Sequence, residues 1–165
     1  MKRIGVLALA LIVVLSQPVA LAAQETLPPW RRDLPAGRAQ AVITVGTSEV
    51  QVDLATDPFE QQLGLGYRNG LDDDTGMLFL GNAPSTRTFW MKGMRFCIDI
   101  IWIENGAVTG AAESVCPDPD GTPDAERARF SSGEPVTYVL EMPAGWMQSN
   151  GYGPGTLVDL GDLKP

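Results

Sequence analysis

The sequence has no histidine, and its 165 residues include only two cysteines. Without histidine the chain cannot form a His-based metal site or a Ser-His or Cys-His nucleophile pair, and it lacks the usual general base near neutral pH. Cationic residues are also scarce, with 12 against 20 acidic residues and a formal net charge of −8. Such a charge repels phosphate backbones. We therefore expect no nucleic-acid partner, no cofactor and no metal site, and a catalytic function is the weaker interpretation.

The N-terminus has the pattern of a secretory signal. Lys2 and Arg3 precede an apolar run at residues 4–15, which is shorter than the roughly 20 apolar residues of a membrane-spanning helix. Residues 20–22, Ala-Leu-Ala, have the small-x-small form that signal peptidase needs. We expect residues 1–22 to be a signal peptide, leaving an exported mature chain in the periplasm or outside the cell, with no stable membrane anchor. Loss of Lys2 and Arg3 changes the net charge from −8 to −10.

The rest of the chain predicts one mainly β domain. Residues 23–40 are rich in proline, arginine and glycine and show no apolar period, so we expect a flexible lead-in. From Ala41, apolar alternation and turn residues predict strands at 41–45, 50–54, 77–80, 97–103, 107–114, 136–142 and 156–160, and short helices at 57–63 and 143–147. The first two strands are expected to form a hairpin with its turn at residues 46–48. The sequence has no alternating strand and helix units, which would indicate a parallel sheet. The expectation is a compact single domain over 41–165, with about seven mostly antiparallel strands and two short helices.

Two local patterns make sharper predictions. Asp57, Pro58 and Glu60 have the types expected at the N-cap, first and third positions of a helix. Phe59 and Leu63 lie four residues apart, so we expect them to form the buried edge of that helix. After the predicted strand at 77–80, residues 81–85 have the composition of a loop.

Five short motifs occur in a characteristic order. They are Gly64-Leu65-Gly66-Tyr67-Arg68, Gly76-Met77-Leu78-Phe79, Phe89-Trp90-Met91-Lys92, Ile98-Asp99-Ile100 and Tyr138-Val139-Leu140-Glu141. On these motifs the chain resembles the DUF192 family, over about residues 41–161. The resemblance implies a small, β-rich, usually exported domain of bacteria or archaea, and it implies no settled activity. The chain departs from the family pattern at Gly66, where methionine is usual, at Gly93-Met94, where a pair beginning with asparagine is usual, and at Cys97, where proline is usual.

Five residues of these motifs are candidates for a site. On a strand, Trp90 and Lys92 would share one face and could bind a polar ligand by stacking and hydrogen bonding. Asp99 and Glu141 interrupt apolar strands, and buried carboxylates need partners. Lys92 and Arg68 are the cations we expect to meet them. The structural interpretation is an ion-pair network that fixes strand register, and the functional one is a shallow polar cleft floored by Trp90.

Cys97 and Cys116 are expected to form a disulfide, because both reach an oxidising compartment and no third thiol competes. Asn105-Gly106 predicts a tight hairpin turn, and regular pairing about it places Cys97 opposite Ser114. Cys116 then lies diagonally beyond, about 7 Å away or more, whereas a disulfide needs Cβ atoms about 4 Å apart. The ladder must therefore bulge or end at Cys116.

Three functions remain open from the sequence. The first is an exported, non-catalytic binding or accessory domain that recognises a polar or saccharide ligand of the cell envelope. The second is a structural domain that contacts a protein partner and no small ligand, which an exposed flat apolar patch would favour. The third is an envelope polysaccharide hydrolase, which requires two carboxylates, such as Asp99 and Glu141, to face each other across an open groove. We rank the binding domain first.

Overall fold

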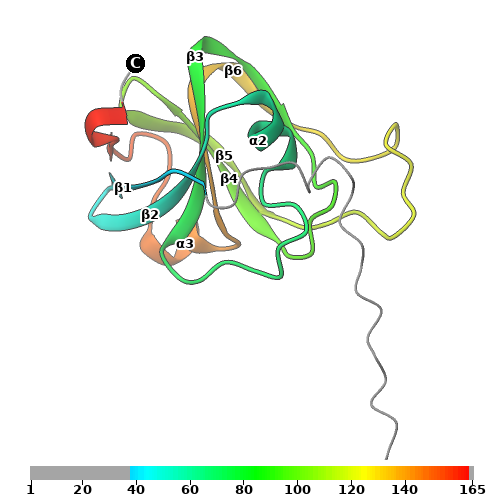
Figure 1. The fold of residues 1–165 in the computed structure, drawn as a ribbon. Helices are drawn as coiled ribbons and strands as arrows, with labels where there is room; N and C mark the ends of the chain where they lie inside the picture. Colours follow the sequence, from blue (N-terminus) through cyan, green and yellow to red (C-terminus); the bar gives the residue numbers. More distant parts are fainter. Residues whose placement is uncertain (1–37, 164–165) are drawn as a thin grey trace, which may run out of the picture. The chain divides into compact units, whose positions relative to one another are not determined.

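The computed structural model describes residues 38–163, which form one curled, mixed β-sheet (Figure 1). The predicted signal peptide and nearly all of the predicted lead-in, up to residue 37, lie outside the described residues. The elements are β1 (Gln40–Val45), β2 (Ser48–Ala55), α2 (Pro58–Leu63), β3 (Thr75–Phe89), β4 (Ile98–Glu104), β5 (Ala107–Val115), β6 (Phe130–Pro143), α3 (Trp146–Asn150), β7 (Val158–Asp159) and a 3-10 turn (Gly161–Leu163). The predicted mainly β domain of about seven strands and two short helices is confirmed. Within this part of the chain no helix is long and apolar enough to cross a membrane.

The first hairpin and the first helix form as their sequences predict, with one exception. Val45 pairs with Ser48, so β1 and β2 are joined by the two-residue turn at 46–47. Asp57 caps α2, accepting hydrogen bonds from the backbone of residues 59 and 60, while Glu60 completes a capping box. The prediction for Phe59 is wrong, because its side chain is 65% exposed and only Leu63 of this helix is buried. With six residues, α2 presents too little surface to bury two large side chains.

The sheet has the order β5-β4-β6-β3-β2-β1-β7. All neighbouring strands are antiparallel except β2 and β3, which run parallel because α2 and the segment after it form a crossover between them. The sequence has no alternating strand and helix pattern that would predict this unit. The two edges of the sheet approach each other at one end, where the backbone of residues 155–158, up to the first residue of β7, hydrogen-bonds to Gly106 and Val108 at the start of β5 over N···O distances of 2.8 Å. This contact holds the sheet in its curl.

Strand β3 is much longer than predicted. Residues 81–85, expected to form a loop, continue β3 as an exposed ribbon paired with the first part of β6, with register shifts between Leu80 and Ser85 and between Thr86 and Thr88. The prediction failed because residues 82–86 are exposed and polar or small, so they show no apolar alternation. Backbone hydrogen bonding to β6, and not burial of side chains, stabilises this ribbon.

Alternate residues of the strands supply two hydrophobic clusters, one on each face of the sheet. In β4, Ile101 and Ile103 belong to the first cluster, which also contains Trp146 and Met147 of α3. Ile98, Ile100 and Trp102 belong to the second cluster, which the segments around residues 65–71 and 89–96 cover. Strand β4 and residues 136–142 of β6 are therefore buried on both faces, as the continuous apolar sequence of β4 predicts.

The Cys97–Cys116 disulfide is present, with a Cα–Cα distance of 4.1 Å. The hairpin begins with Glu104 paired to Ala107, but two register shifts follow, and Ile98 pairs with Val115. Each shift adds one residue to β5, so the two together move Cys116 directly opposite Cys97. The prediction that the ladder must bulge, or end, to allow this bond is confirmed: it does both, because β5 ends at Val115.

Candidate functional site

Trp90 and Lys92 lie just beyond the end of β3, which stops at Phe89. They are therefore not on a strand as predicted, but their side chains do meet, with Lys92 Nζ 5.0 Å from the centroid of the Trp90 ring. The Arg129 guanidinium lies 4.3 Å from the same centroid. Met91, between them, is buried in the second cluster. Two cations already contact the Trp90 ring, which is half-buried.

Lys92 belongs to an ionic network that holds the segment between β5 and β6, residues 116–129, and Arg129 of that segment donates to the backbone carbonyl of Asp124 at 3.0 Å. Lys92 forms an ion pair with Asp124, which also binds Arg127 at 3.1 Å. Hydrogen bonds from Lys92 and then from Arg127 lower the pKa of Asp124. Arg127 in turn lies 3.5 Å from Asp118. Lys92 is thus engaged by a neighbouring segment and not by Asp99 or Glu141.

Asp99 is completely buried and accepts three backbone hydrogen bonds. Ser114 N donates to Oδ1 at 2.7 Å, at the second register shift of the β4–β5 hairpin. Gly145 N donates to Oδ1 and Met147 N to Oδ2, both at 3.0 Å, at the start of α3. Gly145 is the N-cap of α3 and has no side chain with which to cap it, so the Asp99 carboxylate serves this purpose from another strand.

Asp99 and Glu141 lie on opposite faces of the sheet. Asp99 pairs with Met142, whereas Glu141 pairs with Ile100, so the two carboxylates are offset by one residue on neighbouring strands. They cannot face each other across a groove, which removes the geometry that the hydrolase interpretation required of this pair. The predicted ion pairs of these carboxylates with Lys92 and Arg68 are also wrong, because backbone amides serve Asp99 and Arg68 pairs with Asp53.

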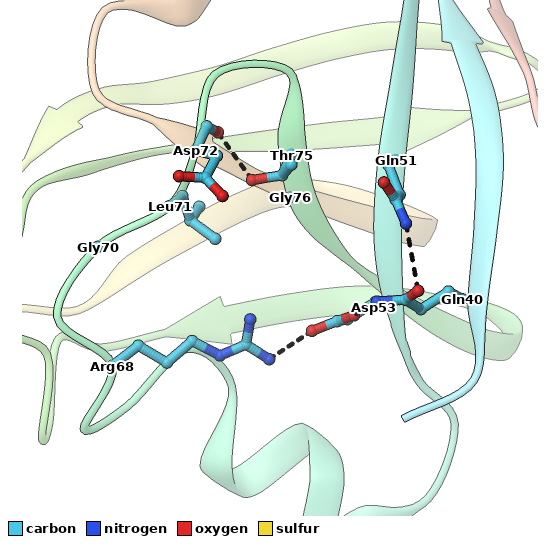
Figure 2. Close-up of a pocket in the computed structure, with 9 residues that line it drawn as sticks. All are labelled: Gln40, Gln51, Asp53, Arg68, Gly70, Leu71, Asp72, Thr75 and Gly76. Carbon is cyan, nitrogen blue, oxygen red and sulfur yellow. Dashed lines mark hydrogen bonds and ion pairs between the residues drawn. The ribbon is translucent and has the colours of Figure 1, made fainter. Parts of the chain in front are cut away.

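Arg68 and Asp53 form an ion pair in the wall of a polar pocket. The pocket has a volume of about 280 Å³ and is lined by Gln40, Gln51, Asp53, Arg68, Gly70, Leu71, Asp72, Thr75 and Gly76 (Figure 2). Arg68 Nη2 donates to Asp53 Oδ2 at 2.5 Å, and Gln40 Nε2 donates to Asp53 Oδ1 at 2.8 Å. Gln51 Nε2 donates to Gln40 Oε1 at 3.2 Å. Partial burial would raise the pKa of Asp53, but the hydrogen bonds from Gln40 and Arg68 outweigh it and lower the pKa.

The pairing of the strands explains why these side chains meet. Gln40 of β1 pairs with Asp53 of β2, Asp53 with Met77 of β3, and Met77 with Glu141 of β6. The four side chains therefore form one row across one face of the sheet. The segment between α2 and β3 lies against this face and brings Arg68 to the row (Figure 2).

Glu141 occupies the buried end of this row. No described residue hydrogen-bonds to its Oε2, which would lie 3.8 Å from a Cβ placed on Gly64. Burial raises the pKa of Glu141 to about 8, and the positive charges of Arg38 and Arg68 oppose this rise without cancelling it. Arg38 is held nearby, since it donates to the Met77 sulfur at 3.1 Å and to the Gly64 carbonyl at 3.4 Å. Glu141 is therefore protonated at neutral pH.

The structure thus separates the five predicted site residues into four places: Trp90 and Lys92 against residues 116–129, Asp99 beneath α3, Glu141 inside the second cluster, and Arg68 in the pocket. The other polar lining residues of the pocket were missed. Gln51 and Asp53 alternate with valines in β2, which is the ordinary pattern of a solvent-facing strand. Only the contact with the distant segment 68–76 makes this face a pocket, and no local signal indicates it.

Two solved structures resemble the chain. One is a protein of Sinorhizobium meliloti 1021 described as a "putative transcription regulator", with 29% identity, a TM-score of 0.68, and coverage of 76% of this chain and 96% of that one. The other is a protein of unknown function from Novosphingobium aromaticivorans DSM 12444, with 28% identity, a TM-score of 0.65, and coverage of 81% and 98%. No curated protein matches the sequence. The model of the DUF192 family (Uncharacterized ACR, COG1430) matches residues 41–160, and the chain belongs to this family.

Proposed function

We propose that the mature chain is an exported, non-catalytic binding domain whose site is the pocket around Arg68 and Asp53. The observation that carries this proposal is the chain of side-chain hydrogen bonds from Gln51 through Gln40 and Asp53 to Arg68 along one wall of the pocket. Such a network holds polar side chains in fixed positions, and fixed polar groups in a hollow are what recognition of a small polar ligand requires. The ligand class is a small polar molecule of the cell envelope, saccharides included.

The proposed export of the mature chain rests on two features. The charged and apolar N-terminal pattern with its Ala-Leu-Ala site favours export. The Cys97–Cys116 disulfide supports it, because disulfides persist in oxidising compartments and are rare in the cytosol.

A catalytic function and nucleic-acid binding both fit the chain less well than binding of a small polar ligand does. The chain has no histidine, and the most strongly shifted carboxyl, Glu141, is buried among apolar side chains and does not line the pocket. We do not extend the description of the Sinorhizobium protein to this chain, because its net charge of −8 repels phosphate. An interface for a protein partner has less support, since the large apolar side chains exposed in the described region, Val42, Phe59 and Leu157, come from β1, α2 and the segment before β7.

The test is NMR titration of the isotope-labelled mature protein with neutral oligosaccharides, acidic envelope fragments and small polar metabolites. We expect amide shifts to cluster at Gln51, Arg68 and Thr75. The double variant Asp53→Asn/Arg68→Gln removes both charges together, so it leaves no unpaired charge, and it should abolish the shifts. The matched control is Lys92→Gln, which removes one cation at the other candidate site. Loss of binding in the control, with shifts around Trp90, would place the site there, and absence of binding in all titrations would contradict the proposal.

A further inference from the structure

The groups of the pocket that the protein itself leaves unused are of two kinds. Arg68 uses Nη2 on Asp53, while its Nη1 and Nε make no hydrogen bond to any described residue, and its side chain is 30% exposed. The Asp72 carboxylate accepts no hydrogen bond from the described residues, because its contacts with Thr75 are made by its backbone carbonyl. Gln51 Oε1 is likewise an acceptor that no described donor uses. The pocket therefore offers a cationic donor and a group of acceptors that includes one carboxylate.

These two kinds of group lie at different sides of the pocket. Figure 2 shows the Arg68 guanidinium at one side, and Asp72 and Thr75 at the other, with Gln51 on the neighbouring strand. Asp53 adds no free charge, because the charges of Asp53 and Arg68 compensate each other. The volume of about 280 Å³ is slightly below the usual range of about 300–1,000 Å³ for ligand pockets, which favours a very small molecule.

We propose that this pocket binds a small zwitterion of amino-acid or dipeptide size, with its carboxylate on Arg68 and its ammonium group on Asp72. The inference rests on the proposed function and specifies its ligand. Arginine can form two hydrogen bonds with a carboxylate, and a carboxylate is a strong acceptor for an ammonium group. A ligand that lacks the carboxylate leaves Arg68 Nη1 and Nε without an acceptor, and a ligand that lacks the ammonium group leaves the Asp72 carboxylate without a cation. A neutral sugar supplies neither charged partner, so the pocket discriminates by hydrogen bonding and charge as well as by size.

The glycine at position 70 allows a test that does not alter charge. Gly70 lines the pocket, its φ is not in the left-handed region, and a Cβ placed on it meets no atom within 4 Å. A Cβ at this position therefore displaces no protein atom, and Gly70→Val extends it by two methyl groups at the pocket. Asp72→Asn is equally mild, because the Asp72 side chain is exposed and makes no hydrogen bond to the described residues. Both variants are expected to fold, as dispersed amide spectra will show.

The experiment titrates the labelled mature protein with alanine and alanylalanine as zwitterions, propionate as the carboxylate alone, ethylamine as the ammonium alone, and methyl glucoside as the neutral sugar. We expect a zwitterion to shift the amides of residues 70–75 and to bind at least tenfold more tightly than the other probes. Asp72→Asn should weaken it at least tenfold, Gly70→Val should abolish it, and Lys92→Gln should leave it unchanged. If methyl glucoside binds the pocket and the zwitterions do not, the proposed function survives and this inference is wrong. If no probe of any class binds, both are wrong.

Discussion

The protonated state of Glu141 makes a quantitative prediction about stability. An unperturbed glutamate has a pKa of 4.5, and burial raises the pKa of Glu141 to about 8 in the folded protein. Between these values the folded state holds a proton that the unfolded state has released, so raising the pH favours unfolding. The stabilising contribution is complete below pH 4.5 and is lost as the pH rises through 8. At 1.36 kcal/mol per pH unit, the loss is about 3 kcal/mol at pH 7 and about 5 kcal/mol above pH 8.

The perturbation that isolates this effect is Glu141→Gln, which keeps the shape of the side chain and removes its titration. The free energy of unfolding should be measured by urea titration of tryptophan fluorescence at unit steps from pH 5 to 9, with the disulfide intact. We expect the free energy of unfolding of the native protein, minus that of the Glu141→Gln variant, to fall by about 1.4 kcal/mol per pH unit from pH 5 to 8 and then to level off. Glu141 Oε2 has no partner among the described residues, and the cost of an unpaired glutamine amide at the same place is independent of pH, so it leaves the slope unaffected.

The control is Glu113→Gln, which changes an exposed glutamate of β5 in the same way. Its difference from the native protein should be flat over the same range. Asp53 has a lowered pKa, so its stabilising contribution is lost as the pH falls toward 3.8 and below, outside this window. A flat difference for Glu141→Gln would refute the argument, because it would mean that Glu141 has an ordinary pKa in the folded state.

Three further predictions concern the other motifs. Asp99→Ala should lower the free energy of unfolding by about 3 kcal/mol or more, because it leaves three backbone N–H groups without an acceptor; an unchanged melting temperature would contradict this role. Replacing Cys97 and Cys116 together by serine should cost roughly 3 kcal/mol, since the bond closes a loop with a sequence separation of 19, and a thiol titration of the denatured, unreduced native protein should find no free thiol. N-terminal sequencing of exported protein should begin at or near Ala23, and a start at Met1 in a membrane fraction would overturn the signal-peptide interpretation.

The elements that the sequence predicts well are those whose signals are local. The Asp57 cap, the turn between β1 and β2 and the Asn105-Gly106 turn each depend on a few adjacent residues, and all three form as expected. The exposed ribbon at residues 81–89 and the parallel pairing of β2 with β3 depend instead on strands far away in the chain. Local composition therefore predicts a loop where the ribbon forms, and it cannot indicate which strand pairs with β2.

The two buried carboxylates show the same limit at the level of chemistry. Asp99 and Glu141 have the same sequence context, an acid within an apolar strand, and the natural expectation is that both find cations. The pairing of β4 with β6 places them on opposite faces, and what meets each face comes from distant segments. Asp99 meets the backbone amides of Ser114, Gly145 and Met147, which satisfy a charge without any cation. Glu141 meets apolar side chains, and Arg38 and Arg68 lie close enough only to moderate its pKa. Asp53 holds Arg68 beyond Met77 in the same row, so Arg68 does not pair with Glu141 and becomes part of the pocket wall, where the described residues leave its Nη1 and Nε unused.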